Sequence, residues 1–204
     1  MLDDAGYEPF PGAEYYQFRK EKKVDGVEVL IKVDLFAQEP PEDAPVKRDA
    51  RRIRPRHFTG LHAHRATEAI AITESPVLVP LSAGVSAATP NLFSYWILKL
   101  FALRDRIVSD EVELARQHAY DLYTLWASTD KGAWEAAQRI SAGHSEHLCV
   151  LEARRFINSL FGTMPSIGTI RLREALRREG NEPDPDLIGD FCSDLLELLP
   201  PIDG

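Results

Sequence analysis

The segment from Leu92 to Val108 constrains the fold more than any other part of the chain. It is apolar on nearly every side of a helix, and Lys99 is the only charged residue between Leu92 and Leu103. A helix that is apolar all round needs other elements packed around it, because its whole surface has to be removed from water. The longest apolar stretch within it, Leu92 to Leu103, is far shorter than the roughly 20 residues that a membrane-spanning helix requires. We therefore expect a central, buried helix.

Strands are predicted before residue 90. From Val27 to Phe36 the sequence VEVLIKVDLF alternates, with one purely apolar face, expected under a layer of helices, and one mixed face that holds Asp34. Asp25-Gly26 predicts a tight hairpin turn that joins this strand to the one before it. The remaining predictions are a strand at Glu14–Lys22, a short strand or short helix at Ala66–Thr73, a short strand at Val77–Leu81 and a loop at Ser82–Pro90.

After residue 90 the apolar residues recur with helical spacing. Asp110 is the predicted N-cap of a second helix, and Gly162 is expected to end a later one. Helices are predicted at Leu92–Val108, from Asp110 to about Trp126, and at Lys131–Ser141, Ser145–Phe161, Ile170–Arg178 and Pro185–Leu199. The fold class is therefore α+β, with a small mixed or antiparallel sheet in residues 1–90 and a helical half with a helical tail in residues 91–204.

Charge and cysteine content exclude several classes of protein. The chain has 204 residues and a formal net charge of −8, which argues against general affinity for nucleic acid backbones, and no DNA partner is expected. Cys149 and Cys192 are too few for a disulfide framework or a zinc knuckle, so we expect buried thiols in a reducing compartment. The first six residues have neither the basic start nor the apolar core of a signal peptide. We expect a cytoplasmic protein with no membrane partner.

Asp34 is the first candidate for chemistry. An aspartate late in a strand, on the less apolar face, can reach a metal ion above the sheet. Phosphoryl and nucleotidyl transfer use such carboxylates to hold Mg²⁺ and to orient the attacking hydroxyl. The alternative is an aspartate that faces solvent and has no ligand.

A second candidate site lies on two of the predicted helices. Tyr95, Lys99 and Arg106 share one stripe of the first helix, and a lysine with an arginine on one face can bind a triphosphate. Burying the Lys99 ammonium unpaired would cost on the order of several kcal/mol, so an anionic partner or an exposed cleft is expected. Asp121, which shares a helix face with His118, can pair with Lys99 or with Arg106. The alternative is a lysine at the edge of the core, a surface arginine and a helical salt bridge.

Residues 47–64 contain two further clusters. The basic residues can guide an RNA or nucleotide phosphate by electrostatics, although a solvated loop that balances the acidic loop before it is the alternative. The histidines can in principle bind zinc, but no carboxylate or cysteine completes a familiar spacing, so we do not predict a metal site there. The two clusters are Lys47, Arg48, Arg51, Arg52, Arg54 and Arg56, followed by His57, His62 and His64.

Three of these features occur in an order that resembles a known family. Asp34 on its strand is followed by YWILKLFALRDR (Tyr95 to Arg106) and then by RQHAYDLYTLW (Arg116 to Trp126). This order is similar to that of the nucleotidyltransferase-fold proteins of the AbiEii abortive-infection toxin type. These have a strand with a lone carboxylate, a helix reading roughly L-x-x-K-L-x-A-L-x-x-R, and a helix with H-x-x-D-L-Y or R-D-x-x-D-L. The stretch LHAHRATEAIAI (residues 61–72) also looks like the family's linking segment. The resemblance covers about Ala5 to Ala127.

The resemblance implies a function and roles for individual residues. Members of the family transfer a nucleotide from an NTP, held with Mg²⁺, to an acceptor hydroxyl, which here implies tRNA or another RNA, or a protein. It implies a toxin of a toxin–antitoxin pair, with a cognate antitoxin as partner. Asp34 would be a catalytic carboxylate and metal ligand, Lys99 would contact the nucleotide phosphates, and Arg106 and Asp121 would support the nucleotide pocket.

The chain departs from the family at the first catalytic motif. The family places a G-S or G-G followed by D-x-D ahead of the strand that carries the lone carboxylate, and no such motif occurs in this sequence. Residues 2–7 look like the last turn of a helix that Gly6 ends, so we expect the natural frame to begin upstream, as an N-terminal truncation would produce. Two hypotheses stay open: a metal-dependent nucleotidyltransferase, and a non-catalytic relative that binds nucleotide, RNA or a partner protein. An unrelated α+β module is the third.

Overall fold

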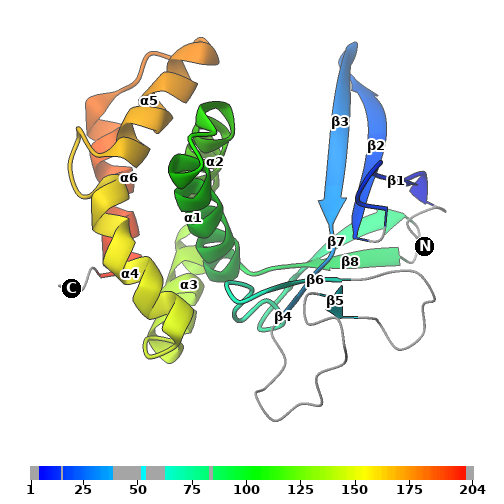
Figure 1. The fold of residues 1–204 in the computed structure, drawn as a ribbon, viewed down its shortest axis with the longest axis horizontal. Coiled ribbons are helices and arrows are strands. Elements are labelled where there is room, and N and C mark those ends of the chain that lie inside the picture. The colour runs from blue at the N-terminus through cyan, green and yellow to red at the C-terminus, as the bar shows by residue number, and fades with distance from the viewer. Residues whose placement is uncertain (1–4, 15, 39–51, 54–62, 83–84, 201–204) are drawn as a thin grey trace. The chain divides into compact units, whose positions relative to one another are not determined.

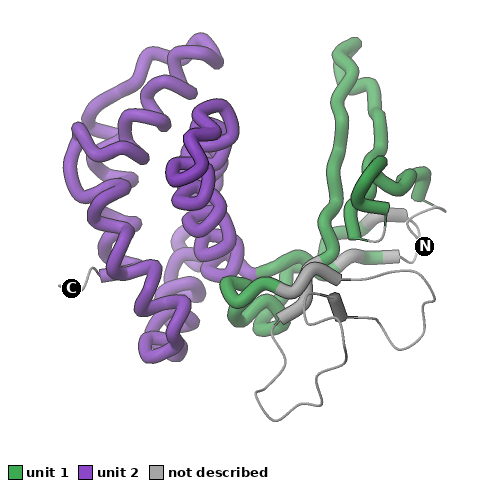
Figure 2. Tube along the Cα trace, viewed as in Figure 1, with its two compact units in different colours: residues 1–90 green, residues 91–204 purple. Residues whose placement is uncertain are grey.

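A computed structural model describes residues 5–14, 16–38, 52–53, 63–82 and 85–200 (Figure 1). Strands occupy the part of the chain before residue 90 and helices the part after it, so the predicted α+β class is confirmed. The chain divides into two compact units, residues 1–90 and residues 91–204 (Figure 2).

Unit 1 contains several small sheets, where the sequence analysis predicted one. The first has the strand order β1-β2-β3, the second β4-β6-β5 and the third β7-β8. All pairings are antiparallel except that of β4 with β6, which is parallel. The strands are β1 (Glu8–Pro9), β2 (Gln17–Val24), β3 (Val27–Asp34), β4 (Phe36–Gln38), β5 (Arg52–Ile53), β6 (Ala63–Ala66), β7 (Val77–Ser82) and β8 (Val85–Thr89).

The β2–β3 hairpin has the predicted turn. Asp25 and Gly26 both have positive φ, 51° and 87°, which is the type I′ geometry that two-residue hairpin loops prefer. Pairing runs from Val24 opposite Val27 next to the turn to Gln17 opposite Asp34 at the other end. The turn sequence therefore sets the register of the whole hairpin.

The prediction that helices cover the apolar face of β3 is wrong at its hairpin end. Val27 is 65% exposed and Val29 is 40% exposed, and only Ile31 and Val33 are half-buried. Alternation shows which side chains share a face of a strand. It does not show whether another layer packs on that face.

Two other strand predictions need correction. Residues 67–74 form turns, with Ala71 at φ 55°, in place of the strand or helix predicted over Ala66–Thr73. Ser82–Pro90 contains strand β8 and is not a loop, because its small residues pair with β7. The strand predicted at Val77–Leu81 is confirmed as β7.

Unit 2 consists of helices whose bounds lie close to the predicted ones. Asn91, Asp130 and Asp184 cap the helices that follow them with side-chain oxygens. Asp110 is not the predicted N-cap, because it has φ 57° and Glu111 occupies that position. The helices are α1 (Leu92–Val108), α2 (Val112–Ala127), α3 (Lys131–Gly143), α4 (Leu148–Phe161), α5 (Ile167–Arg178) and α6 (Pro185–Leu198).

Helix α1 lies at the centre of unit 2, as its composition predicted. It packs against α2, α3 and α4, and Trp96, Ile97, Leu100 and Leu103 have no exposed surface. Burial of each such side chain contributes about 1.5–3 kcal/mol. Among the described residues, no helix has both the length and the apolar character to cross a membrane.

An aromatic cluster joins α2, α4 and α6. The ring of Phe191 in α6 lies 5.7 Å from that of Tyr123, 5.8 Å from that of Trp126 and 5.4 Å from that of Phe161, each in an edge-on arrangement. Trp126 Nε1 also donates a hydrogen bond of 2.8 Å to Asp194 Oδ2. The cluster fixes the last helix of the unit against the second.

Candidate functional site

The site is built around an ion pair between α1 and α2. Lys99 Nζ donates a 2.6 Å hydrogen bond to Asp121 Oδ2, and the two side chains are 21% and 28% exposed. Lys99 is the single charge in the buried part of α1, and Asp121 faces it from the neighbouring helix. The sequence left Lys99 and Arg106 open as partners of Asp121, and in the structure Asp121 pairs with Lys99.

Two further side chains surround the pair. The ring centre of Tyr95, one turn before Lys99 on α1, lies 5.4 Å from Lys99 Nζ, a distance at which a cation and an aromatic face attract. His118 Nδ1 lies 3.9 Å from Asp121 Oδ2, which is too long for a hydrogen bond. Within the described part of the chain this buried nitrogen has no hydrogen-bond partner.

The pKa values of the pair show why both groups carry charge. Burial acts to lower the pKa of Lys99, but the Asp121 hydrogen bond and the nearby Tyr95 outweigh it, so this pKa lies above its ordinary value. Burial likewise acts to raise the pKa of Asp121, but His118 and Lys99 lower it by more than burial raises it. The pKa of Asp121 therefore lies below its ordinary value. At neutral pH the site holds an ammonium group beside a carboxylate.

Arg106 belongs to a different ion pair. Its Nη1 donates a 2.7 Å hydrogen bond to Glu111 Oε1, just before α2, and both side chains are 41% exposed. Arg106 follows Lys99 by seven residues, which corresponds to about 10 Å along a helix axis. It therefore lies on the same stripe of α1 but pairs separately from Lys99 and Asp121.

Asp34 lies in the other unit. It is the last residue of β3, opposite Gln17 of β2, and its side chain is exposed. In the described residues no group of at least three His, Cys, Asp or Glu side chains lies close enough together to hold a metal ion. The convergence of Asp34 with Lys99 and Arg106 stays a prediction.

The basic and histidine clusters fall mostly outside the described residues. Of the basic cluster only Arg52 is described, in β5, and His64 lies in β6. His57 and His62 lie outside the described ranges.

An ion-pair network that the sequence analysis missed ties α5 to α2, the helix that carries Asp121. Arg116 Nε lies 2.9 Å from Glu174 Oε2, which also accepts a 2.9 Å hydrogen bond from Arg171. Glu113 pairs with Arg116 and with Arg178. Spacings of three residues within each helix, as in Glu113 and Arg116, were the only signal in the sequence.

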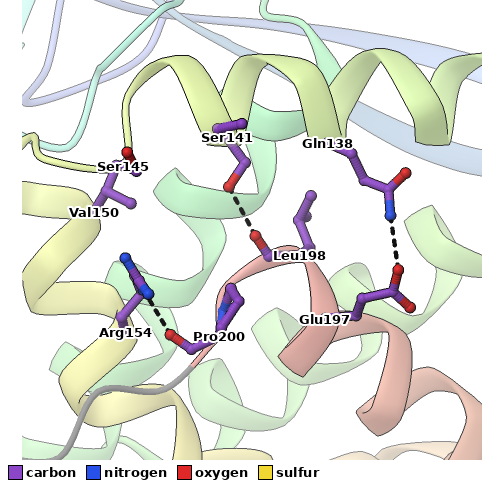
Figure 3. Close-up of a pocket in the computed structure, with 9 residues that line it drawn as sticks. Gln138, Ser141, Ser145, Val150, Arg154, Glu197, Leu198 and Pro200 are labelled. Atoms are coloured by element: carbon purple, nitrogen blue, oxygen red, sulfur yellow. Dashed lines mark hydrogen bonds between the residues drawn. The ribbon is translucent and has the colours of Figure 1, made fainter.

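A cavity of about 250 Å³ opens between α3, α4 and the end of α6 (Figure 3). Ser141 Oγ donates a 2.7 Å hydrogen bond to the carbonyl oxygen of Leu198, and Arg154 Nε donates one of 2.6 Å to that of Pro200. These bonds satisfy carbonyl groups at a helix end. None of the predicted site residues lines this cavity.

Comparison of the chain with family models, with curated proteins and with solved structures found no match.

Proposed function

We propose that this chain is a nucleotidyltransferase-fold protein in which Lys99 binds the phosphates of a nucleoside triphosphate. The observation that carries the proposal is the half-buried Lys99–Asp121 ion pair between α1 and α2. It coincides with the K-L-x-A-L-x-x-R and D-L-Y positions on which the resemblance to AbiEii-type proteins rests.

The chemistry of the pair suits an anionic ligand. An ammonium group has three N–H donors, and a single hydrogen bond to Asp121 leaves donors for phosphate oxygens. Asp121 keeps the ammonium group charged and oriented, while Tyr95 borders it on α1. Partial burial lowers the local dielectric and strengthens the attraction between Lys99 and a phosphate. Arg106, further along the stripe and half-exposed, would extend the positive surface.

The transfer step would need a metal ion as well. Asp34 would hold Mg²⁺ together with the triphosphate oxygens and help to activate the acceptor hydroxyl of an RNA or a protein. In this proposal the chain acts as the toxin of a toxin–antitoxin pair, controlled by a cognate antitoxin.

Replacing Lys99 by methionine tests the nucleotide site directly. Methionine is of similar length and removes only the charge and its donors, so we expect Lys99→Met to weaken binding of Mg²⁺–NTP about 10- to 100-fold. This corresponds to the roughly 1.5–3 kcal/mol of a hydrogen bond to a charged group. Isothermal titration calorimetry with each of the four ribonucleoside triphosphates measures the change.

Lys131→Met is the matched control. Lys131 begins α3, its side chain is 90% exposed and its ion pair with Glu135 is long, at 3.8 Å. We expect this variant to bind nucleotide as the original chain does. Equal affinity for Lys99→Met and the original chain, with both folded by circular dichroism, would show that Lys99 does not contact the nucleotide.

A non-catalytic relative is the second candidate, favoured by the absence from the sequence of the G-S or G-G turn followed by D-x-D. Incubation with radiolabelled NTP, Mg²⁺ and total tRNA separates the two candidates. A labelled product that disappears in Asp34→Asn, while nucleotide binding persists, supports the enzyme. Nucleotide binding without any labelled product supports the non-catalytic protein.

A further inference from the structure

The β2–β3 hairpin has an open edge. Strand β3 pairs with β2 on one side, and within the described residues no strand pairs with its other side. From residue 21 to residue 30 every side chain of the hairpin is exposed. Long exposed edge strands are normally protected, because their free N–H and C=O groups can pair with another chain.

Backbone direction along β3 follows from one hydrogen bond. The N–H of Leu35 donates to the carbonyl oxygen of Tyr16 on the β2 side, so the odd-numbered residues of β3 direct their backbone groups toward β2. The even-numbered residues Glu28, Leu30, Lys32 and Asp34 therefore direct theirs toward the open edge.

Antiparallel pairing of β3 with a second copy of itself has one favourable register. With Leu30 opposite Leu30 of the second copy, Glu28 of each chain lies opposite Lys32 of the other. Val29 then meets Ile31, and Val27 meets Val33. A shift by two residues in one direction places Glu28 opposite Asp34, two like charges. A shift in the other direction brings Lys32 opposite Gly26 of the turn.

We propose that this chain forms a homodimer in which two β3 strands pair antiparallel about Leu30. Glu28, Leu30 and Lys32 then form the hydrogen-bonded pairs, Asp34 lies opposite Gly26 of the other chain's turn, and the symmetry is that of an isologous two-fold interface. Val27 and Val29, 65% and 40% exposed, become part of a continuous apolar face, and Leu30, 45% exposed, packs on its own copy. Two Glu28–Lys32 ion pairs flank the axis on the other face.

Lys32 has to leave one contact to make the new one. Its Nζ lies 5.1 Å from the ring centre of Phe10 in its own chain, a contact worth about 0.5–1 kcal/mol at an exposed site. Glu28 already lies opposite Lys23 within the hairpin. In the dimer Glu28 would therefore have a lysine on each side.

Charge reversal at the two flanking positions tests the register. Glu28→Lys places two lysines opposite each other at both ends of the interface, and Lys32→Glu places two glutamates there. We expect each single variant to raise the dimer dissociation constant about 10- to 100-fold, as cross-strand pairs of like and unlike charge predict. Sedimentation equilibrium over a range of protein concentrations measures this constant.

The two single variants restore each other in this geometry. A mixture of Glu28→Lys and Lys32→Glu chains places lysines opposite glutamates at both ends, so we expect a heterodimer as stable as the original homodimer. Lys22→Glu, a reversal on β2 away from the edge, is the control and should leave the dissociation constant within about threefold. Circular dichroism confirms that each variant is folded.

Three results would overturn the proposal. The original chain could stay monomeric up to its solubility limit. That result would exclude the homodimer whether or not a different protein binds the β3 edge. The two single variants could dimerise as tightly as the original chain, which would place the interface elsewhere. Their mixture could fail to associate although both chains are folded, which would exclude this register.

Discussion

Phe191→Ala is expected to destabilise unit 2 by about 3–5 kcal/mol, the usual effect of truncating a fully buried phenylalanine. Phe191 has no exposed surface, and its ring contacts those of Tyr123, Trp126 and Phe161 on two other helices. The cavity left behind would lie among three rings that cannot close around an alanine. Urea unfolding followed by far-ultraviolet circular dichroism gives the change in the free energy of unfolding.

Leu148→Ala is the control for that experiment. Leu148 is also an apolar residue in a helix of unit 2, α4, but it is 82% exposed. We expect its truncation to change the free energy of unfolding by less than about 0.5 kcal/mol. A cost below about 1 kcal/mol for Phe191→Ala would mean that the aromatic cluster does not stabilise the unit.

Asp121→Ala is expected to lower the free energy of unfolding by about 2–3 kcal/mol at neutral pH. The substitution leaves the half-buried Lys99 ammonium without its carboxylate, and an unpaired buried charge costs more than a lost surface ion pair. Glu135→Ala breaks the exposed pair with Lys131 and should cost at most about 0.5 kcal/mol. The double variant Lys99→Met with Asp121→Ala removes both charges and should recover part of the loss.

The contribution of Asp121 should also depend on pH in a defined direction. Its pKa is lower in the folded protein than in the unfolded chain, whose ordinary value is about 3.9. The stabilisation is therefore fully present above that value and is lost as the pH falls through the lower, folded pKa. We expect the difference in stability between the original chain and Asp121→Asn to shrink as the pH falls below about 4. A difference that stays the same or grows below about pH 4 would contradict the ion pair.

Helical periodicity predicted most of unit 2, because its signals are local. Helix α1 has the predicted bounds Leu92–Val108, and α3, α4 and α6 differ from prediction by one to three residues at an end. The error at Asp110 also has a local cause. An aspartate in the left-handed conformation ends the connection that follows α1, so the N-cap position moves to Glu111.

The strands of unit 1 were harder to predict, because pairing depends on distant residues. Asp25-Gly26 specified the hairpin by itself, whereas nothing local in the small-residue stretch after Ser82 indicated its pairing with β7. The exposure of Val27 is another non-local property. Sequence alternation placed it on an apolar face but could not show that this face is left uncovered at Val27.

The ion pair between Lys99 and Asp121 could be predicted from the sequence, but the separate pairing of Arg106 with Glu111 could not. A lone lysine in a buried helix requires an anion, and Asp121 lay at a helical position from which it could supply one. Arg106 shared the helical stripe, but its carboxylate partner is Glu111, five residues beyond the end of the recognisable motif. Ion-pair choice of this kind depends on side-chain geometry between elements, which periodicity does not contain.

The parallel pairing of β4 with β6 bears on how the chain folds as it leaves the ribosome. Phe36 has to meet His64, so a long loop must close before that sheet gains any hydrogen bond. The helices of unit 2 form local bonds and are expected to fold faster. During translation the slower folding of unit 1 is offset, because unit 1 is synthesised before unit 2. At about 5–20 residues per second, the slower unit has several seconds or more to search for its pairing before unit 2 is finished.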